Sequence, residues 1–138
     1  MQEMQIVIPI TPIGKPRMTR GSTKSDAAER YWQFKDSLIQ WFNIAGYDLY
    51  KMDIHEIHLH AGIPMYPSWS KKKKAKLVGQ PMRQKPDFDN IEKAVGDAIC
   101  FNVKGKGDDS GVYKSSFMKT WTREDEGYLQ IMLRYEDR

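Results

Sequence analysis

The sequence predicts an α+β fold in the order β-α-β-α-β-β, with a mixed sheet packed against two helices. Three observations lead to this prediction: two stretches with apolar residues at helical spacing, four short stretches with the pattern of strands, and a length of 138 residues. That length suits one domain spanning residues 1–138, and no internal repeat or shift in composition divides it.

The first half of the chain supplies a strand, a helix and a second strand. Residues 4–10, MQIVIPI, form a short β-branched run ended by proline and glycine, which is typical of a strand. Between about Ala27 and Ala45 apolar residues recur every three or four positions, so we expect an amphipathic helix that Gly46 ends. In residues 54–66 alternate apolar side chains fall on one side of an extended chain, which predicts the second strand.

The second half adds a helix and two strands. Residues 70–77, SKKKKAKL, favour a short helix inside a basic segment. A helical stripe of apolar residues follows Asp89 and Asn90, so we expect the second main helix to begin at one of these two residues. Residues 111–121 and 127–135 have the pattern of strands, and the short REDEG connection between them predicts an antiparallel hairpin.

Positive charge is concentrated in residues 14–24 and 68–85, while the formal net charge is only +4. Basic clusters interrupted by proline and glycine suit a nucleic-acid backbone, which attracts cations on exposed segments. A solvated lysine-rich loop is the alternative for the run of four lysines taken alone. The residues that we expect to contact nucleic acid are Lys15, Arg17, Arg20, Lys71, Lys72, Lys73, Lys74, Arg83 and Lys85.

Cysteine usage and hydropathy indicate a cytoplasmic protein with no membrane association. Cys100 is the only cysteine, which excludes an internal disulfide and favours a reducing compartment. The N-terminal residues lack a basic start followed by an apolar run, and no 18 apolar residues occur in succession.

Two aspartates, Asp87 and Asp89, lie where the second main helix is expected to begin. Asp89 could cap that helix, with Glu92 returning a bond in a capping box, but capping does not account for Asp87. If the chain stays extended through Phe88, alternation directs both carboxylates to the same side. Two carboxylates held so close repel unless a cation lies between them, and Mg²⁺ takes oxygen ligands of this kind.

The polar face of the same helix continues from Asp89 through Lys93 to Asp97, each one turn apart. Two surface ion pairs would explain this pattern. A place for Lys93 beside a metal site, where it contacts a phosphate or positions a water, would explain it equally well. The spacing alone leaves both interpretations open.

A third acidic site, Asp108 and Asp109, lies in a Gly- and Lys-rich loop just before a strand. Either aspartate could be an ordinary turn residue. A carboxylate in this position can also fold back onto the helix N-terminus, and a third carboxylate would supply enough oxygen ligands for one or two Mg²⁺. Such sites hydrolyse phosphodiesters through a metal-activated water.

The segment KPDFDNIEKAVGDAI followed by GDDSGV resembles the signature of the RusA family of Holliday junction resolvases, endodeoxyribonucleases of bacteria and their phages. GKPRMTR and SWSKKKKAKL are also similar to family members, so the resemblance covers most of the chain. The sequence departs from the family pattern at FNVKGKGDD, where an aromatic or apolar residue often precedes the D-D pair. Gly111 also stands where a larger polar residue is common.

The resemblance implies a structure-selective endonuclease that uses Mg²⁺, with Mn²⁺ able to substitute. It implies a homodimer that cuts four-way DNA junctions in recombination and repair. The residues matching the metal ligands are Asp87, Asp89 and Asp109, and Lys93 matches a lysine needed for cleavage. Further motif positions, which could orient the metal ligands, are Asn90, Asp97 and Asp108.

A nucleic-acid-binding module without catalysis is the alternative to the nuclease. In that case the aspartates only cap the helix and pair with lysines, and binding depends on salt without any nicking in Mg²⁺ or Mn²⁺. Trp69, Tyr66 and Phe88 could stack on unpaired bases near the centre of a junction. Among them we expect core packing more for Phe88 than for Trp69.

Overall fold

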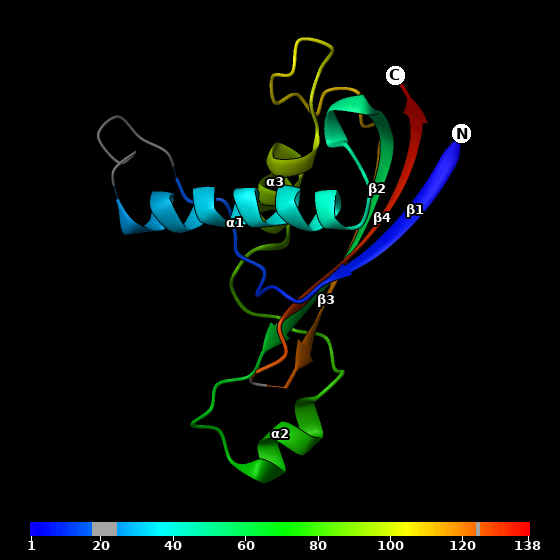
Figure 1. Ribbon diagram of the computed structural model, residues 1–138. Helices are drawn as coiled ribbons and strands as arrows, with labels where there is room; N and C mark the ends of the chain where they lie inside the picture. Colours follow the sequence, from blue (N-terminus) through cyan, green and yellow to red (C-terminus); the bar gives the residue numbers. More distant parts are fainter. Residues whose placement is uncertain (18–24, 124) are drawn as a thin grey trace.

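Four strands form one mixed sheet whose order differs from the order along the chain. The computed structural model describes residues 1–17, 25–123 and 125–138. The strands lie side by side in the order β1-β4-β2-β3 (Figure 1). Their bounds are Gln2–Ile8 for β1, Met52–Pro64 for β2, Lys114–Thr122 for β3 and Tyr128–Asp137 for β4. β4 runs antiparallel to β1 and β2, whereas β3 runs parallel to β2, which confirms the predicted mixed sheet.

The predicted hairpin between the last two strands is wrong. Within the described part of the chain β3 and β4 do not pair, because β2 lies between them. β2 is 13 residues long and buried along most of its length, so the central position covers its apolar side chains best. The connection from β3 to β4 must therefore pass the end of β2. Gly127 packs there, and a Cβ at Gly127 would lie 2.6 Å from Thr11 Oγ1 and 3.1 Å from Pro64 Cγ.

The first main helix, α1 (Asp26–Ile44), confirms the amphipathic helix predicted between about residues 27 and 45. Ser25 caps it, since its Oγ accepts a hydrogen bond of 3.1 Å from the Ala28 N–H. Gly46 follows with φ of 91°, a left-handed conformation that suits glycine, and its N–H donates to the carbonyl of Asn43. The buried stripe consists of Ala28, Tyr31, Phe34, Leu38 and Phe42.

Three further helical elements complete the described structure. A 3-10 turn, η2 (Leu49–Lys51), leads into β2, and α2 (Lys71–Leu77) confirms the short helix predicted in the basic segment. The second main helix is α3 (Phe88–Ile99). In Figure 1, α1 and α3 lie on the same side of the sheet, while α2 extends beyond the sheet at the end opposite the two termini.

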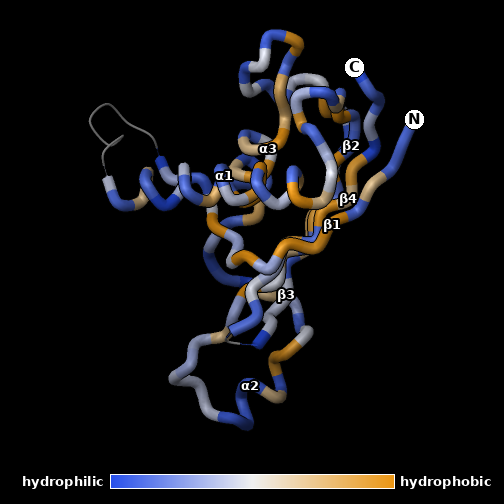
Figure 2. The backbone as a smooth tube through the Cα atoms, viewed as in Figure 1, coloured by the Kyte–Doolittle hydropathy of each residue, from blue (hydrophilic) through white to orange (hydrophobic). Residues whose placement is uncertain are grey.

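The hydrophobic core lies between the sheet and the helices α1 and α3. Figure 2 shows hydrophobic residues along the strands where the helices cover them. One connected cluster of buried side chains includes residues from α1, α3 and all four strands, so these elements form a single domain. Its largest fully buried members are Phe42, Ile8, Leu38, Leu49, Ile91, Ile99, Leu129, Ile131, Leu133 and Val95. None of the helices in the described ranges is long and apolar enough to cross a membrane.

Candidate active site

The N-terminus of α3 carries the two clustered aspartates, and it begins earlier than predicted. The helix starts at Phe88, with Asp87 as its N-cap in extended conformation (φ −66°, ψ 146°). Asp89 therefore lies in the first helical turn, and the expected alternation through Phe88 and the capping box with Glu92 are wrong. The Asp87 side chain makes no capping hydrogen bond, so its carboxylate remains available to another partner.

Both carboxylates open into a shallow cavity in front of the helix. The cavity is lined by Met82, Arg83, Gln84, Lys85, Asp87, Phe88, Asp89 and Lys119. Asp87 and Asp89 are exposed, and no described lysine, arginine or histidine nitrogen lies within ion-pair distance of either carboxylate. The partial positive charge at the N-terminus of α3 favours anionic groups at this position. These features suit the binding of a cation or of a phosphate that a cation bridges.

Asp109 packs on the same helix, but not at the N-terminus of α3, where we expected it. The loop is fixed by two backbone bonds, from the Asp108 N–H to the Cys100 carbonyl (3.0 Å) and from the Val112 N–H to the Asp109 carbonyl (3.1 Å). A Cβ built on Gly96 would lie 3.3 Å from Asp109 Oδ2, so the carboxylate packs directly on the helix backbone there. Gly96 is seven residues after Asp89, or about 10 Å along the axis.

A second cavity joins Asp109 to the polar face of α3. Lys93, Glu92, Gly96 and Asp109 all line it, together with residues of β2 and of the segment leading into β3. Lys93 is exposed, and within the described ranges no carboxylate lies within 4 Å of its ammonium group. Lys93 therefore lies between Asp89, one turn before it, and Asp109, which packs one turn after it.

The three aspartates suit a hard divalent cation in their chemistry, but the described structure does not bring them together around one point as expected. Three aspartates on or against α3 lack a described ion-pair partner, and such oxygen ligands suit Mg²⁺. No group of three acidic, histidine or cysteine side chains within residues 1–17, 25–123 and 125–138 is close enough to hold a metal ion. Bringing the three aspartates around one ion would require the 108–112 loop to move along α3 toward Asp89.

Asp97 is bonded to Tyr31 and Lys15 and does not join Asp89 in the candidate metal site. Its Oδ2 accepts hydrogen bonds from Tyr31 Oη at 2.5 Å and from Lys15 Nζ at 2.7 Å. Asp97 thereby ties α3 to α1 and to the basic segment after β1. Burial alone would raise the pKa of Asp97, but the hydrogen bonds from Lys15 and Tyr31 outweigh burial and hold the pKa below its ordinary value.

We expect Asp97→Asn to destabilise the protein at neutral pH by about 1 to 3 kcal/mol, the usual value for hydrogen bonds to a charged group. Because the pKa of Asp97 is lower in the folded protein, its charged form stabilises the fold fully at pH values above the pKa of Asp97 in the unfolded chain, about 3.8. It is lost as the pH falls through the lower pKa of the folded protein. Urea unfolding of parent and variant at pH 7 and pH 3 measures this difference, with the exposed Asp36→Asn as control. An equal difference at both pH values would contradict the assignment.

Asn90 and Asp108, the other motif positions, shape the backbone around the site. The Asn90 carbonyl accepts a bond of 2.9 Å from the Lys15 N–H, and Gly14 packs against the Asn90 side chain. Asp108 Oδ1 accepts from the Ser110 N–H at 3.0 Å, and this interaction with Ser110 lowers the pKa of Asp108. Asp108 thus stabilises the turn that carries Asp109.

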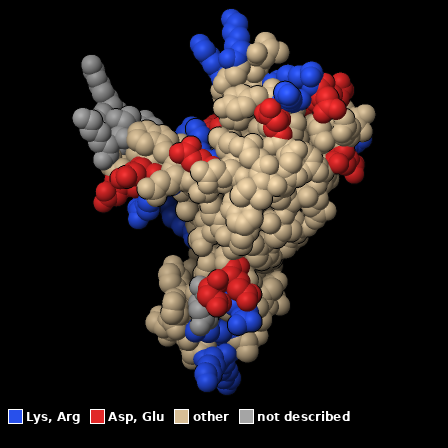
Figure 3. All heavy atoms as spheres, in the orientation of Figure 1, with Lys and Arg blue, Asp and Glu red and all other residues tan. Residues whose placement is uncertain are grey.

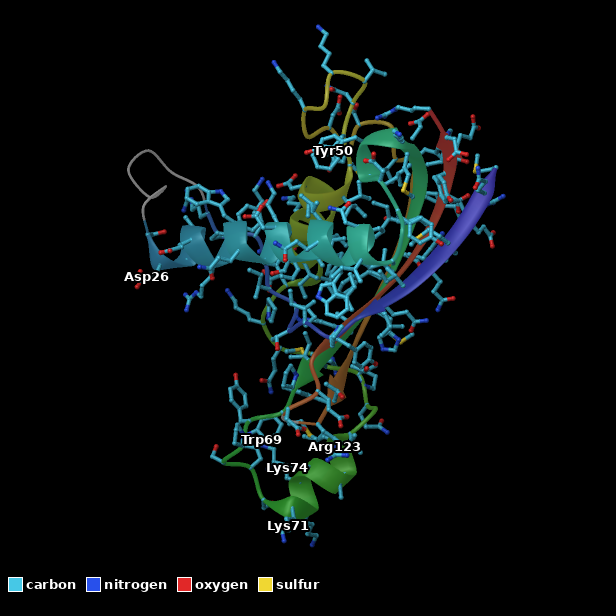
Figure 4. The ribbon with its side chains drawn as sticks, viewed as in Figure 1. Asp26, Tyr50, Trp69, Lys71, Lys74 and Arg123 are labelled. Carbon is cyan, nitrogen blue, oxygen red and sulfur yellow. The ribbon has the colours of Figure 1, made fainter. Side chains whose placement is uncertain are left out.

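The lysine run lies on a projecting arm, residues 66–82, which we call the α2 arm. Trp69 fixes its base by packing edge-on against Trp121 of β3, with ring centroids 5.0 Å apart. Lys73 Nζ lies 3.8 Å from the Trp69 ring centroid, and Lys74 Nζ donates to the Pro67 carbonyl. Figure 3 shows basic side chains gathered at this end of the molecule, and Figure 4 shows Lys71 at the outer end of the arm.

The other cations predicted to contact nucleic acid lie outside the α2 arm or at its end. Arg83 and Lys85 line the cavity with Asp87 and Asp89, at the point where the arm returns to α3. Lys15 is bonded to Asp97, and Arg17 is exposed beyond it. The predicted residue Arg20 lies outside the described residues.

Core packing was expected more for Phe88 than for Trp69, and the structure shows the reverse. Phe88 is 59% exposed at the start of α3, whereas Trp69 is partly buried against the core cluster. The Phe88 ring lies 6.2 Å from the ring of Phe117, centroid to centroid, so it packs over the sheet edge while one side stays open. Phe88 is therefore the aromatic that stands beside the carboxylates.

Lys119 is a site residue that sequence reasoning did not identify. It lies on β3 and reaches the cavity in front of Asp87. Burial lowers its pKa, and the negative charge of Asp87 opposes that shift. No local signal could have identified it, because a lysine within a half-exposed strand is ordinary and the contact spans more than thirty residues along the chain.

Comparison with known protein families gives a match over most of the chain. Residues 8–134 match the family model described as Endodeoxyribonuclease RusA. The matched range contains α1, the α2 arm, α3 and the loop that carries Asp109. No curated protein matches the chain.

Proposed function

The chain belongs to the RusA family of endodeoxyribonucleases, and from that membership we propose that it resolves four-way DNA junctions in recombination and repair in a Mg²⁺-dependent reaction. Enzymes of this family hydrolyse DNA at Holliday junctions and generally depend on a divalent metal. The observation that carries the proposal is the family match over residues 8–134, which includes every element of the candidate site.

Three carboxylates are proposed to hold the metal: Asp87 and Asp89 from the N-terminus of α3, and Asp109 from the loop packed on Gly96. Their lack of described ion-pair partners supports this assignment. When bound, Mg²⁺ neutralises charge on the scissile phosphate and lowers the pKa of a water that attacks it. Mn²⁺ is proposed to substitute, because it accepts the same oxygen ligands.

Lys93 is proposed to contact the scissile phosphate or to orient the attacking water. It lines one cavity with Asp109 and lies one helical turn from Asp89. An ammonium group without a described carboxylate partner can donate to a phosphate oxygen and stabilise negative charge that develops there.

DNA binding is proposed to use the α2 arm together with Arg83, Lys85, Lys15 and Arg17. Cations on an exposed, projecting element suit a duplex arm of the junction, because phosphate contacts fix its position without reading sequence. A homodimer is proposed as the active form, since a two-fold symmetric enzyme matches a two-fold symmetric substrate and can cut two strands in equivalent positions. Sedimentation with and without a junction tests the dimer.

Incubation of an end-labelled four-way junction with the protein tests the function. We expect paired, symmetrical incisions in Mg²⁺ or Mn²⁺, none in EDTA, and far slower cutting of a linear duplex of the same sequence. Binding of the junction without incision under all of these conditions would favour the non-catalytic module instead.

Gly96 provides a further prediction for this site. We expect Gly96→Ala to raise the free energy of unfolding by up to about 1 kcal/mol, because alanine favours the helix. The new Cβ displaces the exposed Asp109 carboxylate, which lies 3.3 Å from that position. Misplacing a catalytic group by less than an ångström is expected to slow junction cleavage by about 10-fold. Urea unfolding and single-turnover cleavage measure the two effects, and unchanged cleavage would show that Asp109 does not act from its position on Gly96.

A further inference from the structure

The backbone that leads into Asp87 is held by a single side chain from the sheet. Lys119 Nζ donates to the carbonyl oxygen of Gln84 at 2.5 Å and to that of Pro86 at 2.7 Å. The Lys119 carbonyl in turn accepts a bond of 3.0 Å from the Met82 N–H. Lys119 therefore contacts residues 82–86 three times, and the last of these contacts is one residue before Asp87.

These contacts cross between two separate parts of the fold. Lys119 lies on β3, where its backbone pairs with Ala61 of β2, so its position is set by the core of the sheet. Residues 83–87 are exposed or half-buried and belong to no strand or helix. A segment without helix or strand is thus attached to the sheet through an ammonium group, which has three donors and here uses two of them on backbone carbonyls.

From this geometry we infer that Lys119 is a positioning residue, which holds the segment entering α3 so that the Asp87 carboxylate faces its cation. The inference rests on the proposed metal-dependent nuclease function. Lys119, Asp87 and Asp89 line one cavity. Pro86, whose carbonyl accepts from Lys119, directly precedes Asp87, so a change in the backbone at Pro86 moves the Asp87 carboxylate. A metal ligand that is oriented in advance binds its ion more tightly than one on a loose segment.

Lys119 could instead act only as a counter-charge to Asp87. For the removal of Lys119, this role and the positioning role predict opposite changes in metal affinity. If the ammonium group only neutralises Asp87, removing it relieves repulsion of the incoming cation, and metal binding becomes tighter. If the ammonium group orients the backbone, removing it loosens Asp87, and metal binding becomes weaker. The sign of the change in metal affinity therefore distinguishes the two roles.

The test uses Lys119→Met and Lys119→Arg in the full chain, with Lys114→Met as the matched control on the same strand. Lys114 is exposed and lies 3.9 Å from Glu56, away from the carboxylates of the site. Mn²⁺ binding without DNA is measured by electron paramagnetic resonance. Junction affinity in Ca²⁺ and single-turnover cleavage in Mg²⁺ are measured on the same samples.

We expect Lys119→Met to weaken Mn²⁺ binding and to lower the cleavage rate, each by about 10- to 100-fold, as loss of a residue that orients a metal ligand does. Junction affinity stays within about threefold, since phosphate contacts elsewhere supply it. Lys119→Arg restores part of both losses, because a guanidinium also donates to two carbonyls. Lys114→Met behaves like the parent.

Tighter or unchanged Mn²⁺ binding by Lys119→Met overturns the inference, whatever happens to the cleavage rate. If Lys119→Met fails to fold, Lys119→Gln is used, which keeps a donor but loses the charge. Metal affinity of that variant equal to or above the parent's overturns the inference, and weaker affinity supports it. A parent protein that neither binds Mn²⁺ nor cuts the junction would instead reject the proposed function itself.

Discussion

Asp89→Asn is expected to lower the rate of junction cleavage by more than about 100-fold, which exceeds the usual effect of removing a residue that only orients a metal ligand. Asparagine keeps the size of the side chain and its position in the first turn of α3, but it removes the negative charge that attracts a divalent cation. Junction affinity should stay within about threefold, because phosphate contacts from the basic segments supply most of it. Single-turnover cleavage in Mg²⁺ and junction binding in Ca²⁺ measure the two quantities.

The matched control for Asp89→Asn is Asp36→Asn, which removes the same charge from an exposed position of α1. It should cleave at the parent rate, and urea unfolding should show both variants to be folded. Cleavage retained by Asp89→Asn would remove Asp89 from the metal site. Loss of junction binding together with cleavage would instead indicate that Asp89 shapes the DNA-binding surface.

Replacing Lys71 and Lys72 by glutamine is expected to weaken junction binding by about 30-fold at 0.15 M salt, if each lysine contacts one phosphate. The slope of log affinity against log salt concentration should fall by about 1.8, since each phosphate contact contributes about 0.9. Both side chains are exposed on the α2 arm, and neither has a described ion pair, so their removal should leave the fold intact. Fluorescence anisotropy with a labelled junction at several salt concentrations gives both values.

The control for the arm removes two charges from the opposite end of the sheet, with Lys51→Gln and Arg138→Gln. These residues lie together there, since the Arg138 N–H donates to the Lys51 carbonyl. Their removal should leave the salt slope unchanged. An equal loss of affinity from both pairs would mean that overall charge, rather than the arm, attracts the junction.

The helices and their buried faces could be predicted because they depend on local patterns. The apolar spacing of α1 and its terminal glycine are short-range features, and both are present as expected. The short helix in the lysine run follows in the same way from Ser70 and the residues after it. Such features need no knowledge of what the helix packs against.

The partner of each strand could not be predicted, because it depends on contacts between distant segments. A five-residue connection between β3 and β4 suits a hairpin, and nothing local indicates that β2 separates them. The prediction for the burial of the two aromatics, Trp69 and Phe88, was wrong for the same reason. Whether Trp69 or Phe88 is covered depends on Trp121 and Phe117, both far away along the chain.

The candidate site shows the same division between local and distant features. Asp87, Asp89 and Lys93 could be predicted as candidate site residues because they lie close together along the sequence at the start of α3. The resting place of Asp109 depends on the missing side chain of Gly96, and the support for Asp87 depends on Lys119 from another strand. Neither relation is visible in the spacing of residues.

The pairing of β1 with β4 sets the order in which the protein can assemble during synthesis. The first strand pairs with residues 129–135 in the described sheet, so its strand partner is synthesised about 120 residues after it. Met4 and Ile8 belong to the core and lack this strand partner during that time. A nascent chain arrested before β4 emerges should therefore expose its first strand to chaperones and proteases.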